Sequence, residues 1–232
     1  MPKQQSWSGG TVKVDTADKK HLVKEPQQQH NLAMAPNRCV LLTGPPNAGK
    51  SATCLQIAAR SAPFHKVFVL HGTPGTKEYG IIDHVKLDAM PEPSYWKSQS
   101  KEANGKPLLV IIDDYSTDVS KDEKKNIEMM MRTCASHLGI LVLITAHAHT
   151  NIAPKWRRCC TTHICWPPAD RTSWNYLARG MNMMPKQLAA AFEQCKQSPL
   201  GKRSFVLYEM DPPPGRAPCR IDGEHAFDIE GL

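Results

Sequence analysis

The octapeptide GPPNAGKS at residues 44–51 has the residue types and the spacing of a phosphate-binding loop. Its glycines allow backbone N–H groups to curl around phosphate oxygens, and a helix that begins there adds the partial positive charge of its N-terminus. Lys50 would reach the outer phosphates, and Ser51 would offer its hydroxyl to Mg²⁺. The residues predicted to contact ATP are Gly44, Pro45, Pro46, Asn47, Ala48, Gly49, Lys50, Ser51 and Ala52.

A P-loop also needs acidic residues at the end of a neighbouring strand, and LLVIIDD at residues 108–114 supplies them. Asp113 is predicted to hold Mg²⁺ together with Ser51, and Asp114 to polarise the attacking water. The alternative for Asp114 is a role in capping the turn that follows the strand. The two motifs together predict a Mg²⁺-dependent ATPase.

The elements that must position these motifs alternate between apolar strands and helices. Strands are predicted at residues 38–44, 66–70, 107–114, 139–147, 162–166 and 203–211. Helices are predicted at residues 51–62, 120–138 and 185–197. Continuous apolar strands between helices indicate an α/β fold, a RecA-like P-loop NTPase with a mainly parallel central sheet covered by helices on both faces.

Local signals refine two of these segments. Ser120 and Glu123 form a plausible capping box at the start of the second helix. Residues 71–107 are rich in Gly, Pro and charge, so a strand at 80–87 is expected among residues that are otherwise mostly loop. This segment could grip DNA or be a solvated insertion.

The chain divides into three parts by composition. Residues 1–35 are expected to form a flexible, basic and polar arm with a short strand at 11–14, residues 36–210 the ATPase domain, and residues 211–232 an irregular, Pro-rich tail. No run of about eighteen apolar residues exists, so no membrane span is predicted. The start lacks the apolar core of a signal peptide, which favours an intracellular protein.

The net charge of +7 is concentrated in one part of the chain. Residues 151–204 carry nine Lys or Arg and two acidic residues, Asp170 and Glu193. Such a surface suits a polyanionic partner, because each neutralised phosphate releases a counterion. The alternative is a solvated basic face without a partner.

Four segments in order resemble a known family: LLTGPPNAGKS, VIIDDYS, ASHLGILVLIT and PKWRRCCTTHICW. Over about residues 36–210 the chain is similar to the poxvirus-type genome-packaging ATPases, a viral branch of the FtsK/HerA superfamily of DNA-pumping P-loop motors. The resemblance implies a polar sensor of the γ-phosphate at the end of the strand after the acidic one. The positions available are Thr145, His147 and His149, of which His147 is favoured, although the family often has Gln here.

The resemblance also implies an arginine that reaches the nucleotide of a neighbouring subunit. This position falls on Arg158, with Arg157 as the alternative. Two residues later, the Asn that is common in the family is replaced by Cys160. Asp114, Arg158 and His147 are therefore the predicted catalytic residues.

The function that the resemblance implies is an ATP-driven motor that translocates double-stranded viral DNA into a preformed capsid. Its partners would be double-stranded DNA, the viral capsid and further copies of itself in a homo-oligomeric ring. It would act inside an infected host cell or on the virion. Two alternatives stay open: a replicative DNA helicase of a small viral genome, and a slow nucleotide-dependent switch that scaffolds capsid assembly.

A competing interpretation of the segment 159–165 is a zinc site made by Cys159, Cys160, His163 and Cys165. Structural zinc sites usually pair two knuckles across a longer spacer. Adjacent cysteines on an extended segment point in opposite directions, so only one of the first two could join easily. The sequence therefore favours the arginine interpretation, and the eight cysteines read as reduced thiols.

Overall fold

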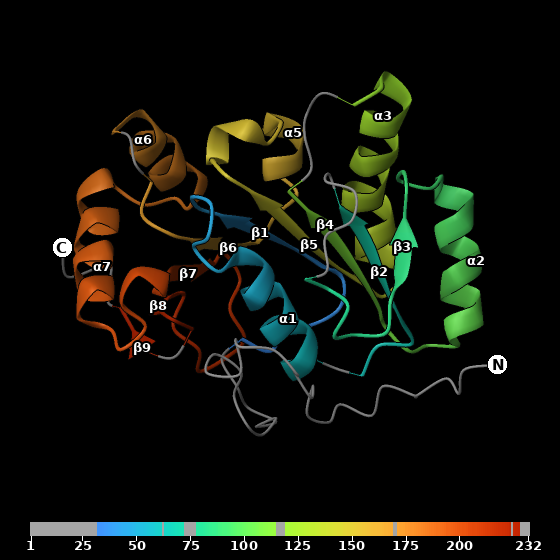
Figure 1. Ribbon diagram of the computed structural model, residues 1–232, viewed down its shortest axis with the longest axis horizontal. Helices are drawn as coiled ribbons and strands as arrows, with labels where there is room; N and C mark the ends of the chain where they lie inside the picture. Colours follow the sequence, from blue (N-terminus) through green and yellow to red (C-terminus); the bar gives the residue numbers. More distant parts are fainter. Residues whose placement is uncertain are drawn as a thin grey trace.

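The computed structural model describes residues 32–61, 63–71, 78–114, 119–168, 171–223 and 225–227. Its strands form one nine-stranded sheet in the order β3-β2-β4-β5-β1-β6-β7-β8-β9 (Figure 1). Six neighbouring strands, from β3 to β6, are parallel, and β7, β8 and β9 continue the sheet antiparallel. The strands are β1 Arg38–Thr43, β2 Lys66–His71, β3 Val85–Leu87, β4 Leu108–Asp113, β5 Ile140–Ala146, β6 Thr162–Cys165, β7 Val206–Glu209, β8 Cys219–Ile221 and β9 His225–Ala226.

Helices cover both faces of this sheet (Figure 1). They are α1 Lys50–Arg60, α2 Pro93–Ala103, α3 Lys121–Met129, α4 Ala135–His137, α5 Pro154–Arg157, α6 Arg171–Gly180 and α7 Pro185–Gln197. None of the helices in the described part of the chain has the length and apolar character needed to cross a bilayer.

Alternation along the strands explains how one sheet supports two cores. In β1, Val40 packs on the side of α1 with Ile57, whereas its neighbour Leu41 packs on the opposite side. That opposite core also contains Trp96 of α2 and Ile127 of α3. The predicted α/β P-loop NTPase fold with a mainly parallel, doubly covered sheet is confirmed.

The strand order gathers the motifs at one edge. β5 lies between the P-loop strand β1 and the acidic strand β4, with Thr43 opposite Ala146 and Ile112 opposite Ile144. Since the carboxyl ends of parallel strands meet at one edge, the residues that follow β1, β4 and β5 lie together.

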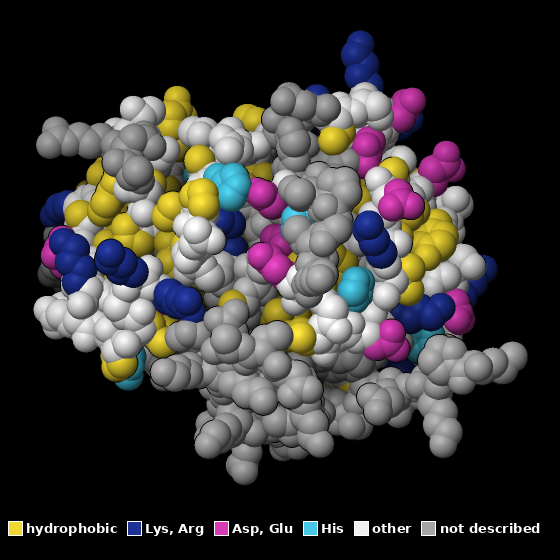
Figure 2. Space-filling view, viewed as in Figure 1, with side chains coloured by type: hydrophobic (Ala, Val, Ile, Leu, Met, Phe, Trp, Pro, Cys, Tyr) yellow, Lys and Arg dark blue, Asp and Glu magenta, His cyan; other side chains and the backbone are white. Residues whose placement is uncertain are grey.

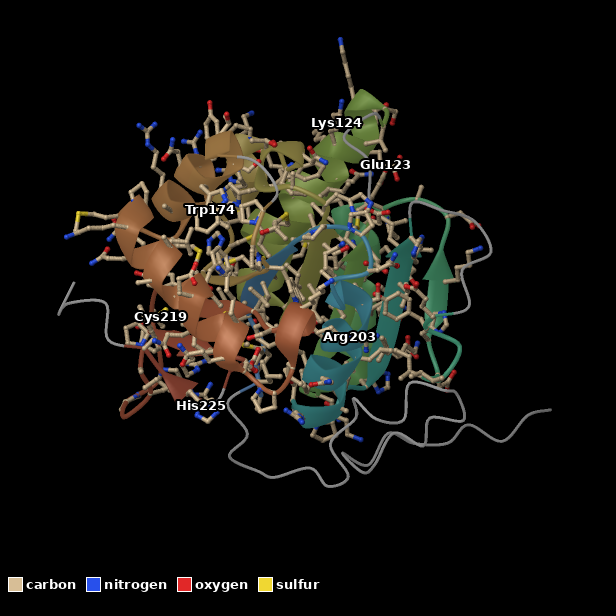
Figure 3. The ribbon with its side chains drawn as sticks, turned by 60° about the vertical axis from the view of Figure 1, so that its left-hand side comes forward. Glu123, Lys124, Trp174, Arg203, Cys219 and His225 are labelled. Carbon is tan, nitrogen blue, oxygen red and sulfur yellow. The ribbon has the colours of Figure 1, made fainter. Side chains whose placement is uncertain are left out.

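The predicted helix at 120–138 is helical from Lys121 to His137, as α3, a π-helical turn over Met130–Cys134, and α4. Ser120 Oγ accepts a hydrogen bond of 3.2 Å from the backbone N–H of Glu123, which is half of the expected capping box. The other half of a capping box is a hydrogen bond from the backbone N–H of Ser120 to the Glu123 side chain. That prediction was wrong, because the Glu123 carboxylate instead accepts from the backbone N–H of Met90 at 3.2 Å. Glu123 thereby ties the start of α3, where Figure 3 shows it, to the segment before α2.

The expectation that residues 71–107 are mostly loop outside the strand at 80–87 was wrong for residues 93–103. Residues 93–103 form α2, which has a proline at its first turn and buries Trp96 completely. Within the predicted strand at 80–87, the three residues of β3 are the ones that pair with β2. Helix α6 was also not predicted.

The expectation of an irregular tail at 211–232 was wrong for its central part. β8 pairs with β7, with Cys219 opposite Tyr208, and β9 pairs with β8. Figure 3 shows Cys219 and His225 of these strands at the end of the molecule where α7 lies. The sheet therefore continues beyond residue 210.

The predicted arm at 1–35 falls mostly outside the described residues, as does its expected strand at 11–14. Its last described residues belong to the folded body. Leu32 and Met34 are buried in the core on the α1 side of the sheet. The arm prediction was therefore wrong for these positions.

Candidate nucleotide-binding site

The GPPNAGKS loop leaves β1 and enters α1, as a P-loop requires. Asn47 and Gly49 have positive φ angles of 61° and 108°, so the backbone curls on itself immediately before the helix. Gly44 is required for a different reason, because a Cβ there would lie 2.8 Å from Cβ of Trp166. The residues predicted to contact the nucleotide, 44–52, therefore form the loop before α1 and the first turn of that helix. A loop of this shape at a helix N-terminus can hold a phosphate group.

Lys50 lies over this loop and is 7% exposed. Its Nζ donates to the carbonyl oxygens of Gly44 and Pro45, both at 3.0 Å. Burial lowers the pKa of Lys50, while the carboxylates of Asp114 and Asp113 oppose the shift. The ammonium group is therefore held where phosphate oxygens could replace the loop carbonyls as its acceptors.

Ser51 and Asp113, the predicted magnesium ligands, are in direct contact. Ser51 Oγ donates to Asp113 Oδ2 at 3.1 Å, and Thr145 Oγ1 donates to Asp113 Oδ1 at 2.5 Å. Asp113 is 2% exposed, so its carboxylate is fixed by these two hydroxyls. A carboxylate and a hydroxyl at the end of the P-loop are the hard oxygen groups that Mg²⁺ prefers.

Asp114 and His147, two predicted catalytic residues, also meet. His147 Nε2 lies 3.0 Å from Asp114 Oδ1, and His147 Nδ1 lies 3.4 Å from Lys50 Nζ. Asp114 has a positive φ of 48°, so it also makes the turn after β4 that was its alternative role. The structure brings Lys50, Asp114 and His147 together; their catalytic roles stay predictions.

The other two candidate sensors point elsewhere. Thr145 is completely buried, and its Oγ1 also accepts from the backbone N–H of Asp114 at 2.8 Å, so it orients both aspartates. The ring of His149 packs 5.9 Å from that of His163. A Cβ at Gly180 would lie 2.7 Å from the His149 ring, so His149 faces α6.

The two candidate arginines differ in their surroundings. Arg157 is half-buried and donates to the carbonyl oxygen of His149 at 3.2 Å. Arg158 is exposed, and its Nε donates to the carbonyl oxygen of Pro154 at 3.4 Å, within the same helical turn. Arg158 is therefore the one whose guanidinium faces solvent.

The zinc interpretation of the segment 159–165 is not supported. Cys160 packs in the core beneath α3, and Cys165 packs in a separate core with α6 and α7. Burial raises the pKa of both thiols well above the ordinary value, which disfavours the thiolates that zinc requires. Within the described ranges, the side chains that can converge on a metal ion are instead His71, Glu78 and Asp113.

His71 and Glu78 are the residues that sequence reasoning missed. His71 ends β2 and lies opposite Asp113 in the sheet. A polar residue at the carboxyl end of a buried strand was the available signal, since ligands bind along that edge. Placing it beside Asp113 requires knowing that β2 neighbours β4.

The buried histidines predict that stability falls in mild acid. Burial is the main cause that lowers the pKa of His149 to about 3 and of His163 to about 4. In the unfolded state both imidazoles have pKa values of about 6.5, so that state binds more protons than the folded state as the pH falls. The full free energy of unfolding is therefore present only above about pH 6.5. The loss levels off once the pH passes below the two folded-state values.

We expect the free energy of unfolding to fall by about 2 kcal/mol per buried histidine between pH 7 and about pH 5. Urea unfolding at the two pH values measures this loss. His163→Leu should remove about half of it, whereas the same change at the exposed His137 should remove none. Equal losses in the wild type and both variants would contradict the assignment.

Comparison with known proteins agrees with the fold that positions these residues. No protein-family model matches the chain, and no curated protein sequence matches it. Several solved structures do match the chain in fold. The genome-packaging NTPase B204 of Sulfolobus turreted icosahedral virus 2, in complex with ATP-γS, aligns with a TM-score of 0.55 at 15% identity over 81% of this chain and 98% of that one.

Two further structures support the same fold. The DNA-packaging ATPase B204 of Sulfolobus turreted icosahedral virus aligns with a TM-score of 0.52 at 14% identity over 76% of this chain and 94% of that one. The cytoplasmic domain of the Thermomonospora curvata Type VII secretion ATPase EccC aligns with a TM-score of 0.54 at 12% identity over 78% and 26%. The chain thus has the P-loop NTPase fold that is found in these packaging and secretion ATPases, in agreement with the resemblance read from its motifs.

Proposed function

We propose that this protein is a Mg²⁺-dependent ATPase that translocates double-stranded viral DNA into a preformed capsid. The observation that carries the proposal is the convergence of Lys50, Ser51, Asp113, Asp114 and His147 at the carboxyl edge of the sheet. The likeness to B204, which extends over nearly the whole of that chain, supports the choice among P-loop functions.

Each residue has a defined task in this proposal. Lys50 exchanges its bonds to the loop carbonyls for bonds to phosphate oxygens. Ser51 and Asp113 would hold Mg²⁺, which would neutralise phosphate charge. Asp114 orients the attacking water, and His147, which contacts both Asp114 and Lys50, senses the γ-phosphate.

The motor is proposed to work as a homo-oligomeric ring in which Arg158 of one subunit completes the site of the next. The basic segment 151–204 would contact the phosphate backbone of duplex DNA without reading its sequence. Its exposed cations include Arg179, Lys186 and Lys196, and Figure 2 shows Lys and Arg side chains gathered on the side of the molecule where α7 lies. The place of action would be the infected host cell or the virion.

The proposal is tested by the steady-state ATPase rate of the full chain with and without long linear duplex DNA. Single strands at the same nucleotide concentration provide the comparison, and Lys50→Ala provides the blank. We expect the duplex to stimulate hydrolysis more than single strands do, and the blank to hydrolyse nothing in either case.

The other outcomes would overturn the proposal in distinct ways. Equal or greater stimulation by single strands would indicate the replicative helicase. Nucleotide binding without DNA-stimulated hydrolysis would indicate the slow switch that scaffolds capsid assembly.

A further inference from the structure

Two strand ends and one turn bring a histidine and two carboxylates together beside the P-loop. His71 is the last residue of β2, Asp113 is the last residue of β4, and the two are direct partners in the parallel pairing of these strands. His71 Nε2 lies 3.4 Å from Asp113 Oδ2. Glu78 joins them from the turn before β3, so that one ligand atom from each residue lies within 4.8 Å of the other two.

The charge balance around these residues favours a cation. The carboxylates of Asp113 and Glu78 meet in this cluster, and Asp114 follows Asp113 in the chain, with its Oδ1 3.0 Å from His147 Nε2. Three carboxylates thus lie at this edge of the sheet with one ammonium group, that of Lys50, whose Nζ is 3.4 Å from His147 Nδ1. Figure 2 shows acidic side chains gathered near the middle of the face, flanked by histidine. A bound divalent ion would offset the excess negative charge before phosphates, which are also negative, approach.

The ligand types indicate which ion fits. Mg²⁺ prefers oxygen ligands, whereas an imidazole nitrogen with two carboxylates suits a first-row transition metal such as Mn²⁺. Asp113 is buried and fixed by hydroxyls from Ser51 and Thr145, so it offers a preformed ligand. Glu78 is exposed and can close on the ion from the solvent side.

We propose that His71, Glu78 and Asp113 form a site for a divalent transition-metal ion of the Mn²⁺ class, which fills before nucleotide binds. Its relevance to hydrolysis rests on the proposed function, because Asp113 is shared with the proposed nucleotide-bound magnesium. Binding of the metal itself does not depend on that function.

The test is titration of the nucleotide-free full chain with Mn²⁺, followed by electron paramagnetic resonance of the bound ion. We expect about one tightly bound ion per chain, with ¹⁴N modulation of the electron spin echo from a coordinated imidazole. His71→Gln should abolish the modulation and weaken binding by at least ~tenfold, and Glu78→Gln should weaken binding by at least ~tenfold while retaining the modulation.

Controls separate this site from its surroundings. His147→Gln should keep the ¹⁴N modulation, since that ring contacts Asp114 and Lys50. Glu193→Gln, at an exposed position on α7, should bind Mn²⁺ as the wild type does. Because Glu78 is also exposed, its variant tests the site even if His71→Gln does not fold.

Absence of bound Mn²⁺ without nucleotide, absence of nitrogen modulation, or unchanged binding by Glu78→Gln would each overturn the proposal. Hydrolysis with Mg²⁺ alone is measured in parallel. A chain that hydrolyses ATP but fails these binding tests would refute the metal site only. One that passes them without hydrolysing ATP would refute the ATPase proposal only.

Discussion

Arg158→Ala is expected to lower kcat for ATP hydrolysis by about 10³-fold while ATP binding changes little. The position of Arg158 argues for action on a neighbouring subunit. The backbone N–H of Thr161 donates to the carbonyl oxygen of Cys39, near the start of β1, whereas the P-loop follows the end of β1 at Thr43. Cys39 and Thr43 are four residues apart along β1, which corresponds to about 13 Å. Thr161, three residues after Arg158, is thus fixed at the far end of β1 from the P-loop, and Arg158 itself is exposed to solvent, where a second subunit could meet it.

Mixing inactive variants provides the decisive measurement. Subunits carrying Lys50→Ala lack a working site but keep Arg158, and subunits carrying Arg158→Ala have the reverse defect. A mixture should regain part of the activity that each lacks alone. Arg157→Ala is the matched control, because Arg157 is bound to the carbonyl oxygen of His149 and should affect kcat much less. A mixture without activity, or an equal loss for Arg157→Ala, would contradict the assignment.

Glu209→Gln is expected to lower the free energy of unfolding by about 3 kcal/mol, because it removes the charge that several buried or half-buried cations share. Glu209 is 1% exposed on β7. Arg220 Nη2 of β8 lies 2.7 Å from its carboxylate, with Arg38 Nη1 at 3.5 Å and Arg216 Nη1 at 3.8 Å. Arg220 is 2% exposed, so its charge cannot turn to water without local unfolding.

The measurement is urea unfolding of both proteins at neutral pH. Glu193→Gln is the matched control, since Glu193 is exposed on α7 and pairs with Lys196 at 2.6 Å in solvent. Exposed pairs of this kind contribute less than about 1 kcal/mol. If the two variants lost similar amounts, the cluster around Glu209 would not hold the antiparallel strands to the parallel sheet.

The parts of the fold and site that sequence predicted are those determined by local pattern. The apolar runs at 38–43, 108–113 and 140–146 contain enough consecutive branched side chains to specify buried strands. The P-loop is equally local, because its function depends on the backbone of one turn. Lys50, Ser51 and Asp113 were therefore found together where the structure places them.

What the sequence could not supply depends on partners far away in the chain. Helix α2 is mostly polar and is held by Trp96, whose environment comes from β2, β4 and α3. β8 and β9 are too short to show a pattern of their own and exist through pairing with β7. His71 can be recognised as a candidate metal ligand only once the strand order is known, because that order places it beside Asp113. The proposed role of Arg158 depends on a second subunit.

The described sheet ends in short strands on both sides. β3 has three residues and β9 has two, so neither edge presents a long row of free backbone N–H and C=O groups. Long exposed edges allow chains to associate by extending their sheets, which tends toward open-ended aggregation. In the proposed ring, the described part of each subunit would therefore contact its neighbours through helix faces and side chains rather than by extending the sheet. Such contacts could be strengthened or released during the proposed ATPase cycle without breaking the hydrogen bonds that hold each subunit together.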